Sequence, residues 1–249
     1  MAQLYILKAR SNTALIRVLV KIILIFMTIE LVAGFPPEYY MLSIDEQKVE
    51  FAKTISKLTK NANTKTLQKR AFALNYLQQI YQQSFRDIDI SNLKRLISIQ
   101  KEYKVSNLFD ENEYKLKLDS VPVSLAIAQA TIESGWGKSR FAKEANNLFG
   151  HWTWGGKGLV PLNRDEDKMH KIKIFNSLDD SVNAYALNLN SHPAYAQFRD
   201  MRAIHREKKL TYDGLEAAKT MENYSQMGKT YVKQLEKTIK LYDLTKFDF

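Results

Sequence analysis

The 249-residue chain contains no cysteine, which excludes disulfides, cysteine-based metal sites and cysteine nucleophiles. It has four histidines, and none of them stands in an HExxH or similar metal-ligand spacing. We therefore expect no metal site and no cofactor. A serine hydrolase is also disfavoured, because no G-x-S-x-G motif is present.

Acidic residues are fewer than basic ones, 27 against 37, and the formal net charge is +10. A positive balance favours anionic partners such as nucleic acid, a membrane surface or an anionic wall polymer. The basic residues are scattered along the chain, and no zinc-finger or RNA-recognition signature occurs. Nucleic acid is therefore not an expected partner.

The chain also lacks an uninterrupted apolar run of the about 20 residues that a membrane span needs. Residues 22–29, IILIFMTI, are flanked by Lys21 and Glu30. With the basic residues before them, and with Val32 and Gly34 at the −3 and −1 positions of a cleavage site, they predict an export signal over residues 1–34. The alternative is an uncleaved membrane anchor through residues 18–34. Either interpretation predicts export to the periplasm or cell envelope.

Glycine and proline are absent from residues 43–105, and this stretch has a helical pattern. Ser43 and Glu46 form a capping box. Apolar residues then predict three helices: one with Phe51, Ile55 and Leu58, a second from Leu67 to Tyr81, and a third capped by Ser91. No chemical motif occurs here. We interpret residues 35–114 as an N-terminal helical region that packs in front of a catalytic unit, with partner docking as the alternative.

Residues 122–139, PVSLAIAQATIESGWGKS, predict a buried helix that ends in one carboxylate. Pro122 suits the first helical turn, and Ser134-Gly135 stops the helix. Glu133 lies on the same side as Gln129 and small alanine side chains, which leave room in front of it. An apolar helix behind the carboxylate and an indole, Trp136, beside it would raise its pKa and make a general acid.

The remaining residues predict a small lobe and a helical C-terminal half. Asn146 and Asn147 suit a turn, and the apolar Leu148-Phe149 pair after it is expected in the core. Residues 150–176 predict a β-hairpin lobe, because isoleucines at 172 and 174 alternate with lysines. Its tip is the charged turn at residues 163–168. Helices then follow, the first capped by Ser177.

The stretch AIAQATIESGWGKSRFAKEANNLFGHW, residues 126–152, closely resembles the bacterial glucosaminidase family, which cuts peptidoglycan, and within it the Bax-type proteins. The resemblance runs over roughly residues 115–242. It implies a mainly α, lysozyme-like α+β fold, with a helical catalytic domain at residues 115–245 that carries a small β-hairpin lobe. It also implies cleavage of glycan strands after N-acetylglucosamine, with Glu133 as the catalytic acid.

Two routes remain open for the second catalytic group. An inverting hydrolase holds a second carboxylate about 6.5–9.5 Å from the acid, and the hairpin tip offers Asp165, Glu166 and Asp167, with Glu166 ranked first. In the other route the N-acetyl group of the substrate acts as the nucleophile. Tyr224 and Tyr231, in a segment that resembles a family stretch reaching the cleft, would then orient it.

Sugar rings stack on aromatic side chains, because each ring has an apolar face. Trp136, Trp152 and Trp154 are therefore candidate substrate-binding residues, together with Asn147 of the NNLFG motif. The sequence thus predicts a peptidoglycan hydrolase. The alternatives are a lytic transglycosylase that uses the same Glu133, and a non-catalytic wall-binding module.

Overall fold

The computed structural model describes residues 33–161 and 169–248. The chain divides into two units, Met1–Val32 and Ala33–Phe249, and only the second contains described residues. The predicted signal or anchor at residues 1–34 therefore lies almost wholly outside them. No helix in the described part of the chain is long and apolar enough to cross a membrane.

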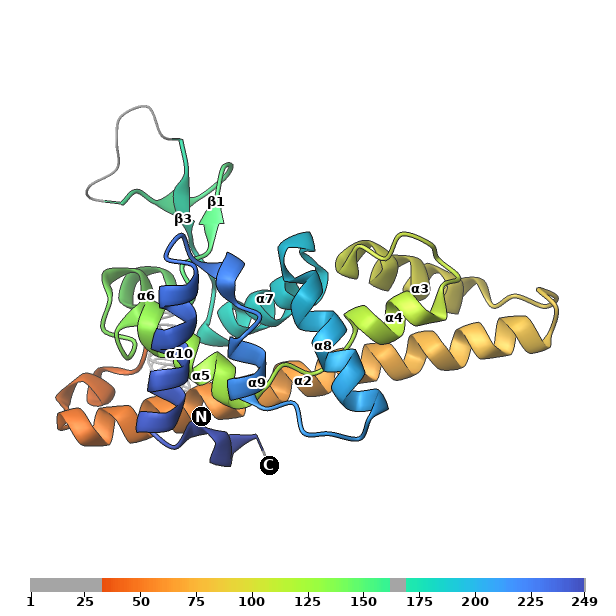
Figure 1. Ribbon diagram of the computed structural model, residues 1–249. Helices are drawn as coiled ribbons and strands as arrows, with labels where there is room; N and C mark the ends of the chain where they lie inside the picture. Colours follow the sequence, from red (N-terminus) through yellow and green to blue (C-terminus); the bar gives the residue numbers. More distant parts are fainter. Residues whose placement is uncertain (1–32, 162–168, 249) are drawn as a thin grey trace, which may run out of the picture. The chain divides into compact units, whose positions relative to one another are not determined.

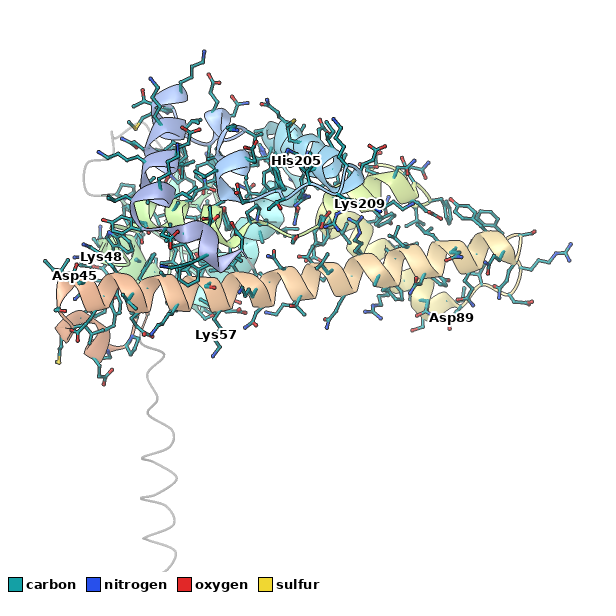
Figure 2. The ribbon with its side chains drawn as sticks, turned by 60° about the horizontal axis from the view of Figure 1, so that its bottom comes forward. Asp45, Lys48, Lys57, Asp89, His205 and Lys209 are labelled. Carbon is teal, nitrogen blue, oxygen red and sulfur yellow. The ribbon has the colours of Figure 1, made fainter. Side chains whose placement is uncertain are left out.

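One helix of 39 residues, α2 (Ile44–Gln82), runs along the described unit (Figures 1 and 2). The predicted capping box is confirmed at its start, where Ser43 and Glu46 each accept a backbone N–H of the other. The prediction of two separate helices in this range was wrong. The polar stretch between them stays helical, and its Asn63 exchanges two hydrogen bonds of 2.8 Å with the backbone of Val121.

The far half of α2 packs on α3 (Ile90–Tyr103) and α4 (Glu111–Lys117). Helix α3 begins two residues earlier than predicted, because Asp89 and not Ser91 is its cap: the Asp89 side chain accepts the N–H of Asn92 at 2.9 Å. Figure 2 shows Asp89 beside the far end of α2. These helices share a core of their own, to which Tyr76, Leu77, Leu96, Tyr103 and Tyr114 belong.

The centre of the fold is α5 (Val123–Ser134), which carries Glu133 and has every residue from 123 to 131 buried. Pro122 caps it at its start, and Gly135, with a φ of 56°, ends it as predicted. The short helix α6 (Arg140–Ala145) follows. Leu148 and Phe149 are both buried, which confirms their predicted place in the core.

The small lobe is a three-stranded antiparallel sheet in the order β1-β3-β2, one strand more than the predicted hairpin. Figure 1 labels β1 and β3 of this lobe. Its strands are β1 (Trp152–Thr153), β2 (Gly158–Leu159) and β3 (Lys171–Lys173). Ile172 on β3 pairs with Trp152 on one side and with Leu159 on the other. The predicted strand around Ile172 is thus confirmed, and the predicted fold class, mainly α with a small β lobe, is confirmed as well.

Helices cover the rest of α5. The predicted cap at Ser177 is confirmed, since its side chain accepts the N–H of Asp180. The elements of this half are α7 (Leu178–Ser191), α8 (Ala196–Glu207), α9 (Gly214–Ala218) and α10 (Lys229–Leu241), with 3-10 turns at Pro193–Tyr195, Glu222–Tyr224 and Leu244–Phe247. A further 3-10 turn, Pro37–Met41, precedes α2.

A buried carboxylate, Asp119, ties these helices together just before α5. Its side chain forms ion pairs with Arg70 of α2, at 3.3 Å, and with Arg206 of α8. Its carbonyl oxygen accepts hydrogen bonds from Arg202 and Asn190. Because Asp119 binds side chains from α2, α7 and α8, the segment before α5 has a fixed position.

The near half of α2 belongs to the same hydrophobic core as α5, α7 and α10. Phe51 and Ile55 are fully buried in this core, and Phe51 lies edge-on to Trp136, with ring centroids 5.5 Å apart. The N-terminal helical region therefore shares its packing with the helix that carries Glu133.

We expect Phe51→Ala to lower the free energy of unfolding of the whole described unit by about 3 kcal/mol or more, because it leaves a cavity in the shared core. Urea denaturation, followed by circular dichroism and by tryptophan fluorescence, measures this. The matched control is Phe85→Ala near the other end of α2, where the ring is 48% exposed, and it should cost less. A separate unfolding transition for α2, with the remainder unaffected, would contradict the shared core.

Candidate active site

Glu133 stands in the last turn of α5 with its carboxylate half-buried. Its Oε1 accepts a hydrogen bond of 2.8 Å from the hydroxyl of Tyr231. Burial raises the pKa of Glu133 above its usual range, and the hydrogen bond from Tyr231 offsets part of this rise. The group can therefore hold its proton at a pH where an exposed glutamate would have lost it, as a general acid requires.

Tyr231 does not reach Glu133 alone. Its hydroxyl also accepts a hydrogen bond of 3.2 Å from Nε2 of Gln129, which lies one turn before Glu133 on α5. Oε1 of Gln129 in turn accepts a hydrogen bond of 2.6 Å from the hydroxyl of Tyr185 on α7. Three helices, α5, α7 and α10, thus contribute to one continuous chain of hydrogen bonds that ends at the carboxylate.

Both tyrosine rings in this network are held by a parallel ring. Tyr224 stacks on Tyr231 with centroids 5.6 Å apart and an interplanar angle of 3°. Phe149 stacks on Tyr185 at 4.0 Å and 8°. The hydroxyl of Tyr224 also donates to the carbonyl oxygen of Phe149 at 3.3 Å. The rings have little freedom to turn, so their hydroxyl groups stay directed at their partners.

Gly150 leaves open space at the second carboxylate oxygen. A Cβ atom at this position would lie 3.6 Å from Oε2 of Glu133, and the backbone there has a φ of +69°. The preceding residues of the NNLFG motif hold this backbone in place. Asn146 adopts a left-handed conformation with a φ of 52° and donates to the carbonyl of Phe175. The motif thus brings a residue without a side chain to the acid.

Asn147, predicted to bind substrate, is buried and bonds to the backbone of the lobe. Its Nδ2 donates to the carbonyl oxygens of His151 and Lys173 at 2.9 and 2.8 Å, and its Oδ1 accepts the N–H of His151. Its side-chain bonds therefore tie β1 to β3. The substrate contact stays a prediction.

The three predicted tryptophans occupy two different places. Trp136 is partly buried and lies edge-on to Phe51 and to Tyr242, at 4.8 Å from the latter. Trp152 and Trp154 are 49% and 74% exposed on the lobe, with centroids 6.3 Å apart. Only the lobe pair offers large exposed ring surface. The pKa of Glu133 is raised by the overall burial of its side chain.

The candidates for a second carboxylate, Asp165, Glu166 and Asp167, lie outside the described residues. Across the two described stretches, no group of three or more histidine, aspartate or glutamate residues could hold a metal ion. The site as described consists of one acid, its hydrogen-bonded tyrosine, and the aromatic rings around them.

The sequence pattern indicates Glu133 as a candidate acid, but it does not indicate the hydrogen bonds that Gln129 and Tyr185 make in the structure. Tyr185 stands at helical spacing from Val182 and Leu189, so the sequence pattern marks it only as a core residue. Gln129 was seen only as a neighbour of Glu133, although a glutamine in an otherwise apolar buried helix signals a buried hydrogen-bond partner. The partners themselves stand 56 and 102 residues away from Gln129.

Comparisons with known proteins place all of these residues in one matched region. The sequence profile of a family described as mannosyl-glycoprotein endo-beta-N-acetylglucosaminidase matches residues 106–244. Protein bax of Escherichia coli (strain K12) is 35% identical over 144 residues, which are 55% of this chain and 50% of that protein. The chain thus spans about half the length of this curated relative. The catalytic domain of the autolysin Auto from Listeria monocytogenes, a crystal structure, has 20% identity and a TM-score of 0.37, with 71% of this chain and 88% of that chain covered.

We expect Gly150→Ala to raise the pKa of Glu133 further, because the added methyl group removes water from Oε2. The control is Gly156→Ala, which has a similar φ of +77° but no atom within 4 Å of the added Cβ. Both variants should lose stability through backbone strain, roughly 1–2 kcal/mol each. Titration of the Glu133 side-chain carbon by ¹³C NMR separates them, and identical titration curves would show that Gly150 does not border the acid.

Proposed function

The chain belongs to the mannosyl-glycoprotein endo-beta-N-acetylglucosaminidase family, and from this premise we propose that it is a glycoside hydrolase that cleaves peptidoglycan glycan strands at N-acetylglucosaminyl bonds. The observation that carries the proposal is the setting of Glu133. It is a half-buried carboxyl group with a raised pKa, held by one tyrosine at Oε1 and open toward Gly150 at Oε2.

Cleavage of a glycosidic bond needs a proton on the leaving oxygen and stabilisation of a cation-like sugar. Glu133 supplies the proton in this proposal. Its burial raises the pKa of the carboxyl group and so favours the protonated form, and its loss of the proton leaves a carboxylate that Tyr231 stabilises by the 2.8 Å hydrogen bond. The negative charge that forms on Glu133 also stabilises the positive charge that develops on the sugar.

Water then completes the hydrolysis with the help of a second group. One candidate set is Asp165, Glu166 and Asp167, with Glu166 first, as the base that activates water. The other is the substrate's own N-acetyl group, oriented by polar side chains. Tyr224 fits that task better than Tyr231, because the Tyr231 hydroxyl already donates to Glu133, whereas the Tyr224 hydroxyl makes one 3.3 Å contact with a backbone carbonyl.

The exposed rings of Trp152 and Trp154 provide a surface on which sugar rings can stack. We propose them as the glycan contacts of the lobe. A wall polymer as substrate also agrees with the predicted export of the chain to the periplasm or cell envelope, and with its positive net charge.

Product analysis tests the reaction. We expect the full-length chain to release peptidoglycan fragments with reducing N-acetylglucosamine ends, detected by mass spectrometry, and Glu133→Gln to lower the rate by roughly 10²–10⁴-fold. Glu144→Gln, an exposed glutamate on the neighbouring helix, is the control and should keep full activity. Anhydro-muramyl ends would instead identify a lytic transglycosylase. Wall binding without cleavage, equal in wild type and Glu133→Gln, would identify a binding module.

The pH dependence tests the role of Glu133 as the acid. Activity should persist above the ordinary glutamate pKa of about 4.3 and should be lost as the pH rises through the raised pKa of Glu133, because only the protonated form donates. Tyr231→Phe removes the hydrogen bond that lowers this pKa, so the loss of activity should move to higher pH. Rate profiles of kcat against pH measure this, and an unmoved basic limb in Tyr231→Phe would argue against Glu133 as the titrating acid.

A further inference from the structure

We propose that Gln129 and Tyr185 are positioning residues that fix which carboxyl oxygen of Glu133 carries its proton. They touch neither the scissile bond nor the acid itself. They act through Tyr231, by setting the direction in which its hydroxyl hydrogen points. The inference rests on the proposed role of Glu133 as general acid, and it adds the assignment of the donated proton to Oε2.

The carboxylate of Glu133 stands at one end of the network, and it fixes which group donates and which accepts in every hydrogen bond. An ionised carboxylate only accepts hydrogen bonds, so the Tyr231 hydroxyl donates to Oε1 of Glu133. With its hydrogen used, the Tyr231 oxygen must accept from Gln129, which therefore presents its amide nitrogen at 3.2 Å. The amide oxygen of Gln129 then faces Tyr185, whose hydroxyl donates to it at 2.6 Å.

Burial preserves this order when Glu133 becomes protonated. Gln129 and Tyr185 have no exposed surface and Tyr231 has 1%, so no solvent is at hand to replace a lost partner. Burial also raises the pKa values of Tyr185 and Tyr231, which both stay neutral donors. If the Tyr231 hydroxyl alone turned round, its hydrogen would meet the amide hydrogens of Gln129.

Reversal would require two hydroxyl groups to rotate and the amide to turn over together. The stacked rings of Phe149 and Tyr224 hold the two tyrosines in place meanwhile. A single group turned the wrong way would leave a buried donor unsatisfied, which costs about 1–3 kcal/mol. The network therefore keeps one polarity in both protonation states of Glu133.

The fixed direction of the Tyr231 hydroxyl determines which oxygen of Glu133 carries the proton. Oε1 always faces the hydrogen of Tyr231. Since the unprotonated oxygen of a carboxyl group is a better acceptor than its hydroxyl oxygen, Oε2 is the oxygen that carries the proton. Oε2 is also the oxygen beside Gly150, where no side chain fills the space. Gln129 and Tyr185 thus present the acidic proton on the open side of the carboxyl group.

Two substitutions remove the order without removing Tyr231 or Glu133. Gln129→Met keeps the length of the side chain but has no amide. Tyr185→Phe keeps the ring that stacks on Phe149 but has no hydroxyl, and it serves if Gln129→Met folds poorly. The matched control is Tyr114→Phe. Tyr114 is likewise fully buried, but its hydroxyl bonds to nothing within the described residues.

We expect kcat on peptidoglycan to fall roughly tenfold in Gln129→Met and roughly threefold in Tyr185→Phe, with KM within about twofold of wild type, because a misplaced proton slows transfer but not binding. The pKa of Glu133, titrated by ¹³C NMR in the full-length chain, should rise in both variants. Without the fixed order, a protonated Oε1 can donate to Tyr231, which stabilises the protonated form. Tyr114→Phe should change neither value.

An unchanged Glu133 titration in Gln129→Met and Tyr185→Phe would overturn the inference, whether or not kcat falls, because a purely structural role can lower a rate without moving this pKa. Absence of glycan cleavage by the wild-type chain would overturn the proposed function instead. The NMR titration needs no substrate, so it still tests the positioning of the proton in that case.

Discussion

The hydrogen bond from Tyr231 to Glu133 joins the first turn of α10 to the last turn of α5, and the setting of the acid depends on it. A carboxyl group in an apolar pocket would be strongly destabilised when ionised. One donor at Oε1 makes both the protonated and the ionised form tolerable, as the proposed role of Glu133 as general acid requires. The position of α10 against α5 is therefore a condition for the chemistry as well as for packing.

Several contacts elsewhere in the fold hold α5 in place against α10. The segment that leads into α5 is held by Asp119 and its arginine partners, and Asn63 of α2 holds the backbone of Val121. At the other end of α5, Phe51 packs against Trp136 in the turn that follows Glu133. The long helix α2 thus supports α5 near both of its ends, although it carries no catalytic candidate.

Local signals in the sequence predicted the features that depend on neighbouring residues. The capping box at Ser43, the helix that ends at Gly135, the Asn146 turn and the strand at Ile172 are all encoded within a few positions. Features that depend on distant partners were missed. The middle of α2 reads as a break because its asparagines are polar, yet Asn63 is satisfied by a segment 58 residues away. Gln129 likewise gains its role only when α7 and α10 bring two tyrosines to it.

The two tasks proposed for the site, proton transfer and glycan binding, make different demands on structure. Proton transfer depends on precise orientation, and the groups proposed for it are buried or half-buried side chains of α5, α7 and α10, with stacked rings on both tyrosines. Stacking against a sugar tolerates sliding of the sugar ring over the side chain, because it uses the whole face of an aromatic ring. The exposed Trp152 and Trp154 accordingly lie on a lobe whose strands are only two and three residues long. Asn147 connects the two parts, since it bonds to the backbone of His151, just before β1, and of Lys173 on β3, while its neighbours lead to Gly150 beside Glu133. A change in the lobe can therefore reach Glu133 through the NNLFG backbone, without any side chain of the lobe touching the carboxyl group.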